Sequence, residues 1–253
     1  MRVGVVGGTG LGNLMSGERL PVETPWGPVD VVFGRSGRLE TAFVARHGDP
    51  ARPPHRVRFR ANVWALAAAK VDRVVAVNTV GALHATIPTP SFFVPHDFVD
   101  LSGRADERTF HDERAVHVDL SEPYCPEVRR ALVAAASDAG LAARGHGVYV
   151  ASPGPRLETP AETRWYATLG DVVGMTGCPE AALAREKGLC YASLCLVTNP
   201  APGVAPGPVR AVDIAASAKA LADAVGKALA RALGEIPERK ACRCGEALAA
   251  AGI

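Results

Sequence analysis

Short apolar runs alternate along the chain with stretches whose apolar residues recur every three or four positions. The runs are rich in valine and predict buried strands over residues 2–7, 29–33, 39–46, 74–80, 147–151, 172–174 and 190–198. The helical spacing predicts helices over 55–70, 126–139, 179–187 and 209–233. This alternation predicts a single α/β domain with a mostly parallel or mixed sheet flanked by helices.

The junctions between these elements carry their own signals. Thr159, Pro160 and Glu162 have the spacing of a capping box, which predicts a helix start directly after the loop that carries Glu158. Proline and polarity predict a broken strand over 92–99, a loop over 104–119 and irregular structure over 200–208.

Composition excludes several classes of protein. The chain has 253 residues, of which 48% are hydrophobic and 21% charged, values typical of a globular domain with a sizeable core. A net charge of +2 argues against a dedicated nucleic-acid partner. We find no apolar run long enough to span a bilayer and no charged leader before the first strand, so we expect a soluble, cytoplasmic protein without a membrane partner.

The cysteines predict little chemistry of their own. Four of them are scattered through predicted strands and loops, as buried reduced thiols are in cytosolic proteins. Because no pair of CxxC motifs exists, we do not expect a structural zinc site. The exception is Cys242-Arg243-Cys244, which could bind metal or undergo redox chemistry. We favour the simpler interpretation, an idle C-terminal tail.

Several predicted strands end in a residue that can bind an anion: Thr9, Arg46, Thr79 and Thr176. Parallel strands end on one side of a sheet, so these donors could converge on a phosphate. The glycine-rich turn over 7–12 lacks the last glycine of a dinucleotide fingerprint, since position 13 is asparagine, and it is not a P-loop. The alternative is a tight turn beside a surface arginine.

Glu158 and Asn199 suggest a second binding site, next to the one for phosphate. A carboxylate can accept a hydrogen bond from a ring N–H, and an amide can donate to one ring atom and accept from another. Together they could bind a heterocycle. The alternative is that both are polar residues at helix and strand ends that bind no ligand.

Longer motifs carry a family resemblance. The chain resembles the trimeric purine nucleoside phosphorylases, most closely the methylthioadenosine and methylthioinosine phosphorylase branch. The matching segments are GGTGL, RHG, PPHRV, RAN, GPR-ET-AE and VGMTGCPEAALAREKGLCYA, within residues 1–235. The resemblance implies one phosphorylase domain over 1–235 with a mixed, mostly parallel and partly barrel-like sheet, a tail over 236–253, and a homotrimer.

The resemblance also implies roles for individual residues. Phosphate would be bound by Thr9, Arg46, His47, Thr79 and Thr176. The nucleoside would be bound by Leu157, Glu158, Met175, Asn199, His117, Val212 and Ala215. Within this set, Met175 would pack on the ribose and Leu157 on the base. His117 would reach the sugar of a neighbouring subunit, while Val212 and Ala215 would line the pocket for the 5′ substituent.

The base pocket decides the expected substrate. Relatives that cleave adenine nucleosides carry aspartates where this chain has Asn199, Pro200 and Ala201. Glutamate at 158 with asparagine at 199 resembles the pairing in 6-oxopurine phosphorylases, in which glutamate accepts from N1–H. Adenine has no N1–H, and a mismatched buried pair costs about 1–3 kcal/mol. We therefore favour hypoxanthine or guanine nucleosides, with methylthioadenosine phosphorylase as the runner-up.

The implied reaction is phosphorolysis of a purine nucleoside for purine salvage. Inorganic phosphate is the co-substrate, Asn199, Glu158 and Arg46 form the catalytic set, and no metal or organic cofactor is required. A function of another class is a non-catalytic nucleotide-binding α/β domain. The incomplete glycine fingerprint argues against it.

Overall fold

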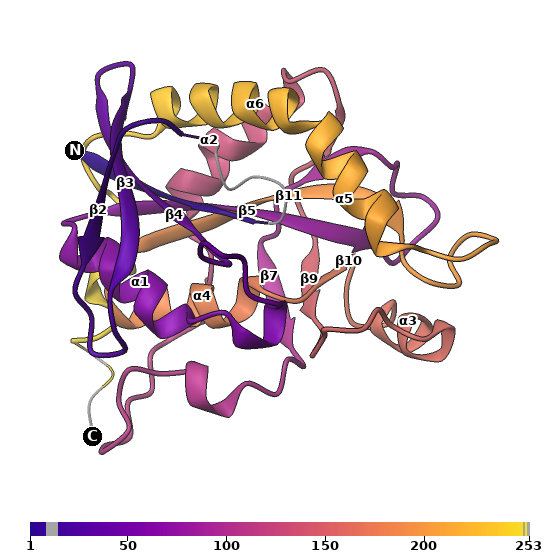
Figure 1. Cartoon of the computed structure of the whole chain (residues 1–253), viewed down its shortest axis with the longest axis horizontal. Helices are drawn as coiled ribbons and strands as arrows, with labels where there is room; N and C mark the ends of the chain where they lie inside the picture. The colour runs from indigo at the N-terminus through magenta and orange to yellow at the C-terminus, as the bar shows by residue number, and fades with distance from the viewer. Residues whose placement is uncertain (9–14, 250, 252–253) are drawn as a thin grey trace.

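A mixed sheet forms the centre of the molecule. The computed structural model describes residues 1–8, 15–249 and 251 (Figure 1). Its 11-stranded sheet has the order β2-β3-β4-β1-β5-β10-β9-β7, with β11 pairing to β5 and β6, and β8 pairing to β6. The strands are β1 Arg2–Gly7, β2 Glu18–Val22, β3 Val29–Ser36, β4 Leu39–Ala45, β5 Arg73–Ala82, β6 Ser91–Phe93, β7 Asp97–Asp100, β8 Ala142–Arg144, β9 Val148–Ala151, β10 Val172–Gly174 and β11 Cys190–Pro200.

Helices cover both faces of this sheet. In Figure 1, α2 and α6 lie above it, and α1 and α4 lie below it. The helices are α1 Phe59–Ala68, α2 Pro126–Ser137, α3 Pro160–Tyr166, α4 Gly177–Glu186, α5 Ala211–Ala220 and α6 Ala222–Glu235, with 3-10 turns at Pro54–Arg56, Ala105–Glu107 and Cys244–Glu246. Within the described ranges, no helix is long and apolar enough to cross a membrane.

The core divides between the two faces because successive strand residues point in opposite directions. On β5, Val75 and Val77 pack into the layer between the sheet and helices α2 and α6. Val74 and Ala76 pack into the layer between the sheet and helices α1 and α4. The central strands β1, β5 and β11 run parallel to one another. The expected single domain with a mixed, mostly parallel sheet is therefore confirmed.

Two strands were missed because they do not carry a buried apolar pattern. In β2, four of five residues are exposed and one is proline. All three residues of β8 are exposed. Two of the predicted helix starts were also misplaced: α1 begins at Phe59, after a 3-10 turn, and α4 begins at Gly177 rather than Pro179. The capping box of Thr159 and Glu162 is confirmed.

The prediction of one helix over 209–233 is wrong. The chain bends at Leu221, which separates α5 from α6. On α6, a continuous stripe from Val225 to Leu233 is buried against α2, whereas Ala218 is the only buried residue of α5. The Ala-rich sequence contains no proline or glycine at the bend, so the break follows from two different packing partners rather than from a local signal.

The C-terminal segment also differs from the expected idle tail. Ile236 and Cys244 are 2% and 3% exposed and belong to the core beneath α2 and α6. The Ala241 N–H donates to Glu127 Oε1 at 2.8 Å, and Lys240 pairs with Asp72 at 3.5 Å. The described part of this segment is therefore packed against the body.

Candidate active site

A cavity of about 220 Å³ lies where β4, β5, β10 and β11 approach the loop before α3 and the start of α5. Most of the predicted site residues line it: Arg46, His47, Thr79, Leu157, Glu158, Met175, Thr176, Asn199 and Ala215. Their positions along the chain are far apart, so only the folded sheet brings them together. A small concave site with a few polar groups is typical of a ligand pocket.

Among the described residues, two predicted site residues do not line the cavity: His117 and Val212. Thr9 lies outside the described residues, so its role stays a prediction. His117 lies elsewhere in the same chain: its N–H donates to the Ala251 carbonyl at 3.0 Å, and its side chain lines a separate hollow with Arg185 and Arg243. Its expected contact with a neighbouring subunit also stays a prediction.

The 5′-pocket assignment of Val212 is corrected by the helix geometry. Ala211, Ile214 and Ala215 line the cavity, whereas Val212 is 68% exposed. Positions i, i+3 and i+4 share one face of a helix, and position i+1 does not. Since α5 begins at Ala211, its cavity face comprises Ala211, Ile214 and Ala215.

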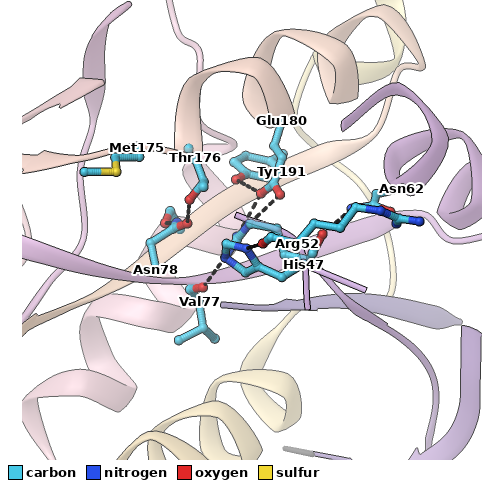
Figure 2. Close-up of polar contacts among 12 residues, drawn as sticks. His47, Arg52, Asn62, Val77, Asn78, Met175, Thr176, Glu180 and Tyr191 are labelled. Carbon is cyan, nitrogen blue, oxygen red and sulfur yellow. Dashed lines mark hydrogen bonds and ion pairs between the residues drawn. The ribbon is translucent and has the colours of Figure 1, made fainter. Parts of the chain in front are cut away.

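Arg46 is buried at the inner end of the cavity and is held by a carboxylate. Its Nε and Nη2 donate to the two carboxylate oxygens of Glu180 at 2.6 and 2.9 Å, and its Nη1 donates to the Val77 carbonyl at 2.8 Å (Figure 2). Burial alone would lower the pKa of Arg46, but the Glu180 carboxylate outweighs it and raises that pKa. Of five guanidinium N–H groups, this leaves two for a ligand. The bidentate fork itself is occupied by Glu180.

Gly8 allows the backbone to approach this guanidinium. A Cβ at position 8 would lie 2.8 Å from Arg46 Nη1 and 2.8 Å from the Val77 carbonyl oxygen. One of these contacts is backbone and cannot move aside easily. The first glycine after β1 therefore serves close packing against Arg46, whatever else the turn contributes.

Glu180 was missed as a site residue. It is fully buried, and besides Arg46 it accepts a hydrogen bond from the Tyr191 hydroxyl at 3.0 Å (Figure 2). Buried carboxylates are rare unless they are paired. The only signal in the sequence was an acid inside the apolar stretch that follows Met175, and the partner lies 134 residues away.

Two threonines line the cavity from different elements: Thr79 lies in β5, and Thr176 is the N-cap of α4. Thr176 Oγ1 donates to Asn78 Oδ1 at 3.1 Å (Figure 2). Asn78 Nδ2 in turn donates to Ser193 Oγ. Thr79 Oγ1 is buried and has no hydrogen-bond partner among the described residues. A buried hydroxyl without a partner is costly, so this oxygen is poised for a ligand in the cavity.

The convergence of these threonines has a different cause from the one expected. Thr79 lies inside β5 rather than at its end, and β10, which precedes Thr176, runs antiparallel to β5. The registered pairs are Val172 with Ala82 and Val173 with Gly81. Continuing this register past β10 brings Thr176 beside Asn78. An antiparallel crossing, not a shared parallel edge, brings the two donors together.

His47 lies on the cavity wall next to Arg46. Its Nδ1 is 2.8 Å from the Arg52 carbonyl, which can only accept, so Nδ1 carries a hydrogen (Figure 2). Burial lowers the pKa of His47, and the neighbouring Arg46 lowers it further, although the Arg52 carbonyl opposes both. The imidazole is therefore neutral at pH 7.

Glu158 and Asn199 lie on the same cavity, and both are partly exposed. Glu158 Oε1 accepts from Ser152 Oγ at 2.7 Å, and Oε2 accepts no hydrogen bond from the described residues. Asn199 Oδ1 accepts from Thr198 Oγ1 and its Nδ2 donates to the Pro200 carbonyl, each at 2.8 Å. These local contacts fix the amide orientation and leave one N–H for a ligand. Ser152 was missed, because nothing in the sequence marks it as the partner of Glu158.

Comparison with known proteins identifies the family of this chain. A model of the phosphorylase superfamily matches residues 2–234. The chain belongs to this superfamily. As a superfamily member it is an enzyme, and its mixed sheet with flanking helices is the nucleoside phosphorylase fold.

Relatives with similar full-length sequences carry two kinds of name. A "Probable S-methyl-5'-thioinosine phosphorylase" of Methanopyrus kandleri is 43% identical over 99% of both chains. A "6-oxopurine nucleoside phosphorylase" of Pyrococcus furiosus is 39% identical over 98% of this phosphorylase and 97% of the relative.

Solved structures extend the similarity to a third group. A methylthioadenosine phosphorylase from an antarctic soil metagenomic library has a TM-score of 0.90 and 32% identity, covering 99% of this chain and 92% of the other. The methylthioadenosine phosphorylase of Schistosoma mansoni in complex with adenine has a TM-score of 0.88 and 28% identity, covering 98% and 96% of the two chains.

Proposed function

We propose that this phosphorylase cleaves 6-oxopurine nucleosides with inorganic phosphate, giving the free base and ribose 1-phosphate or its 5-methylthio derivative. The observation that carries this proposal is the presence of Glu158 and Asn199 on the cavity that also holds Arg46, Thr79 and Thr176. Relatives of about 40% identity named for thioinosine and 6-oxopurine substrates support the same assignment.

Phosphate binds at the inner end of the cavity. The two remaining N–H groups of Arg46 and the hydroxyls of Thr79 and Thr176 are its donors, with His47 beside them. Glu180 neutralises much of the charge of Arg46, so the hydroxyls contribute more to phosphate binding than a free arginine clamp would require. From this position the phosphate stabilises the oxocarbenium-like centre that forms at C1′ and then attacks it.

The purine binds at the outer end, between Leu157 and the polar pair. Glu158 Oε2 accepts from the N1–H of a 6-oxopurine, and the Asn199 amide donates to the ring as negative charge develops on the departing base. With adenine, Glu158 would oppose the N1 lone pair. That mismatch costs about 1–3 kcal/mol, which corresponds to roughly a 5- to 150-fold loss.

The 5′ substituent lies under α5, following the family resemblance. The face of α5 that lines the cavity carries only apolar side chains, those of Ala211, Ile214 and Ala215. A methylthio group buried there gains about 0.8 kcal/mol for each methylene-sized group, whereas a hydroxyl would lack a partner on this face. We therefore place methylthioinosine above inosine and guanosine in the order of substrates.

The deciding experiment compares kcat/KM for methylthioinosine, inosine, guanosine and methylthioadenosine at saturating phosphate. We expect methylthioinosine to be cleaved fastest and methylthioadenosine slowest. The runner-up, methylthioadenosine phosphorolysis, is favoured by the solved structures of similar fold. Cleavage of methylthioadenosine at least as efficient as that of every 6-oxo substrate would establish that alternative and overturn the role of Glu158.

The non-catalytic alternative predicts a different result. A nucleotide-binding domain would bind a dinucleotide such as NAD without phosphate and would release no base from any nucleoside. Titration with NAD and with phosphate, each followed by calorimetry, separates the two functions. Tight NAD binding without any phosphate dependence would contradict phosphorolysis.

We also propose that the enzyme is a cytoplasmic homotrimer that acts in purine salvage and uses no metal or organic cofactor in the reaction. Trimerisation would bring His117 to the cavity of a neighbouring subunit, as the family resemblance implies. Light scattering coupled to size-exclusion chromatography tests the trimer. Activity that persists after treatment with a chelator tests the absence of a catalytic metal.

A further inference from the structure

Four of the six cysteines meet at one point, far from the cavity. The Sγ atoms of Cys125, Cys190, Cys242 and Cys244 all lie within 4.8 Å of one another. All four are free thiols; three are buried and Cys242 is half-buried. They come from the N-cap of α2, the first residue of β11 and the C-terminal segment. The other two cysteines, Cys178 and Cys195, are outside this group.

The spacing of the sulfurs is that of one four-coordinate centre. Tetrahedral zinc with Zn–S bonds of about 2.3 Å holds its sulfurs about 3.8 Å apart. Cys190 Sγ and Cys242 Sγ are 3.3 Å apart, and no pair of the four sulfurs exceeds 4.8 Å. The sulfur–sulfur distance of a zinc site lies between these two values. Shifts of about 1 Å or less would complete the tetrahedron. We propose that these four thiolates bind a structural Zn²⁺ ion.

The ligands are fixed by the surrounding fold. The Cys125 N–H donates to the Tyr191 carbonyl at 2.7 Å, and the Cys190 N–H donates to the Asp72 carbonyl at 3.2 Å. Cys125 also stands at the N-terminus of the 12-residue helix α2, where the helix dipole favours a thiolate. Four sulfur ligands leave no open coordination position, which makes this a structural rather than a catalytic centre.

The ion would fasten the C-terminal segment to the body. Cys242 and Cys244 reach the cluster from the segment after α6, and Cys190 belongs to a central strand. The cavity lies at the opposite end of that strand, near Asn199, about 30 Å away along the chain direction. Zinc would therefore stabilise the fold and take no part in phosphorolysis, so its test is independent of the proposed function.

The proposal differs from the expectation drawn from cysteine spacing, because the four cysteines come from three separate segments. A search for paired CxxC motifs finds sites built from local turns. Here only Cys242 and Cys244 are neighbours in sequence, and their partners lie 52 residues or more before them. Only the fold makes the group visible.

The test measures the metal content of the full chain, expressed with zinc in the medium and purified without chelator. We expect one Zn²⁺ per chain by inductively coupled plasma mass spectrometry. Cobalt substitution should give the visible bands and the sulfur-to-cobalt charge transfer of a tetrahedral thiolate site. Removal of the ion should lower Tm, while kcat/KM below the unfolding range should change less than twofold.

Variants locate the site. Cys242→Ser and Cys244→Ser should each lose most of the zinc, whereas the control Cys195→Ala, a buried cysteine outside the cluster, should keep it. Retention of full zinc content by both serine variants would overturn the proposal. So would a wild-type chain without zinc whose four cysteines are recovered, by alkylation and non-reducing mass spectrometry, as thiols or as two disulfides. That measurement needs no variant to fold. Iron in place of zinc would overturn the assignment of the metal.

Discussion

The two ends of the cavity are built in different ways. At the phosphate end, Arg46 bonds to Glu180 across 134 residues, and Asn78 bonds to Thr176 across 98 residues, in contacts that are buried. At the base end, Glu158 bonds to Ser152 across six residues, and among the described residues the amide of Asn199 bonds only to its two neighbours in sequence. The proposed phosphate end is thus tied to the core, whereas the proposed base end is held by local contacts. Substitutions that break the long-range pairs of the first end should change stability, and substitutions at the second end should change specificity.

The largest expected effect is that of Glu180→Gln. It leaves the buried Arg46 without its counter-charge, which costs about 3–5 kcal/mol of unfolding free energy. Activity should fall with it, because the guanidinium loses the bidentate bond that orients it. Urea-induced unfolding and phosphorolysis assays measure the two effects.

The matched control for Glu180→Gln removes both charges. In Arg46→Met/Glu180→Leu, no unpaired charge remains, so much of the stability should return while activity stays low. A cost below about 1 kcal/mol for the single variant, or equal stability of the single and double variants, would contradict a core-bound phosphate end.

Thr79→Val should separate function from stability. The hydroxyl has no partner among the described residues, so its removal should leave stability unchanged or slightly higher. A lost hydrogen bond to an anion costs about 1.5–3 kcal/mol, so KM for phosphate should rise about tenfold or more. Thr41→Val is the control, since Thr41 Oγ1 is likewise buried without a partner but does not line the cavity. An equal KM in both variants would remove Thr79 from the phosphate site.

Glu158→Gln should shift the choice of base with little change in stability. A glutamine amide can donate to the N1 of adenine, which the carboxylate cannot do. The ratio of kcat/KM for methylthioinosine over methylthioadenosine should fall by about 5- to 150-fold, equivalent to about 1–3 kcal/mol. Glu162→Gln makes the same chemical change four residues later, away from this cavity, and should keep the wild-type ratio. An unchanged ratio in Glu158→Gln would disprove its role in specificity.

His47→Asn should give the smallest effect on stability, seen as a pH dependence of the unfolding free energy. Burial lowers the pKa of His47 in the folded protein below its ordinary value of 6.5. Between these two values the unfolded chain binds more protons, so the stability contributed by neutral His47 is present above pH 6.5 and is lost as the pH falls through the folded pKa. The stability difference between wild type and variant should therefore shrink on acidification. A difference that grows as the pH falls would contradict the direction of this shift.

The sequence predicts the fold well wherever a buried pattern is continuous. The strands β1, β4, β5 and β11 were predicted because their apolar runs are buried by the centre of the sheet. The exposed strand β8 and the bend at Leu221 were not, because edge pairing and a change of packing partner leave no trace in local composition.

Individual residues of the candidate site could be predicted, but the ion pairs and hydrogen bonds between them could not. Glu158 and Asn199 could be chosen from their chemistry and from the family resemblance. The ion pair of Arg46 with Glu180 could not be inferred, since each residue stands in an apolar stretch and the two are joined only by the packing of α4 on the sheet. The same holds for the four cysteines. Long-range pairs depend on tertiary geometry, which a single sequence does not state.

The bend at Leu221 separates a helix that lines the cavity, α5, from a helix that packs in the core, α6. The helix α6 is buried against α2. The helix α5 lines the cavity with one face, places Ala218 in the core and is otherwise largely exposed, so its exposed positions can change without disturbing the core. Exchange of residues 211–220 between relatives would replace, as one unit, the part of the cavity lining that we propose covers the 5′ substituent. A helix that looks continuous in sequence thus separates a part that must stay constant from a part on which new substrate preferences can evolve.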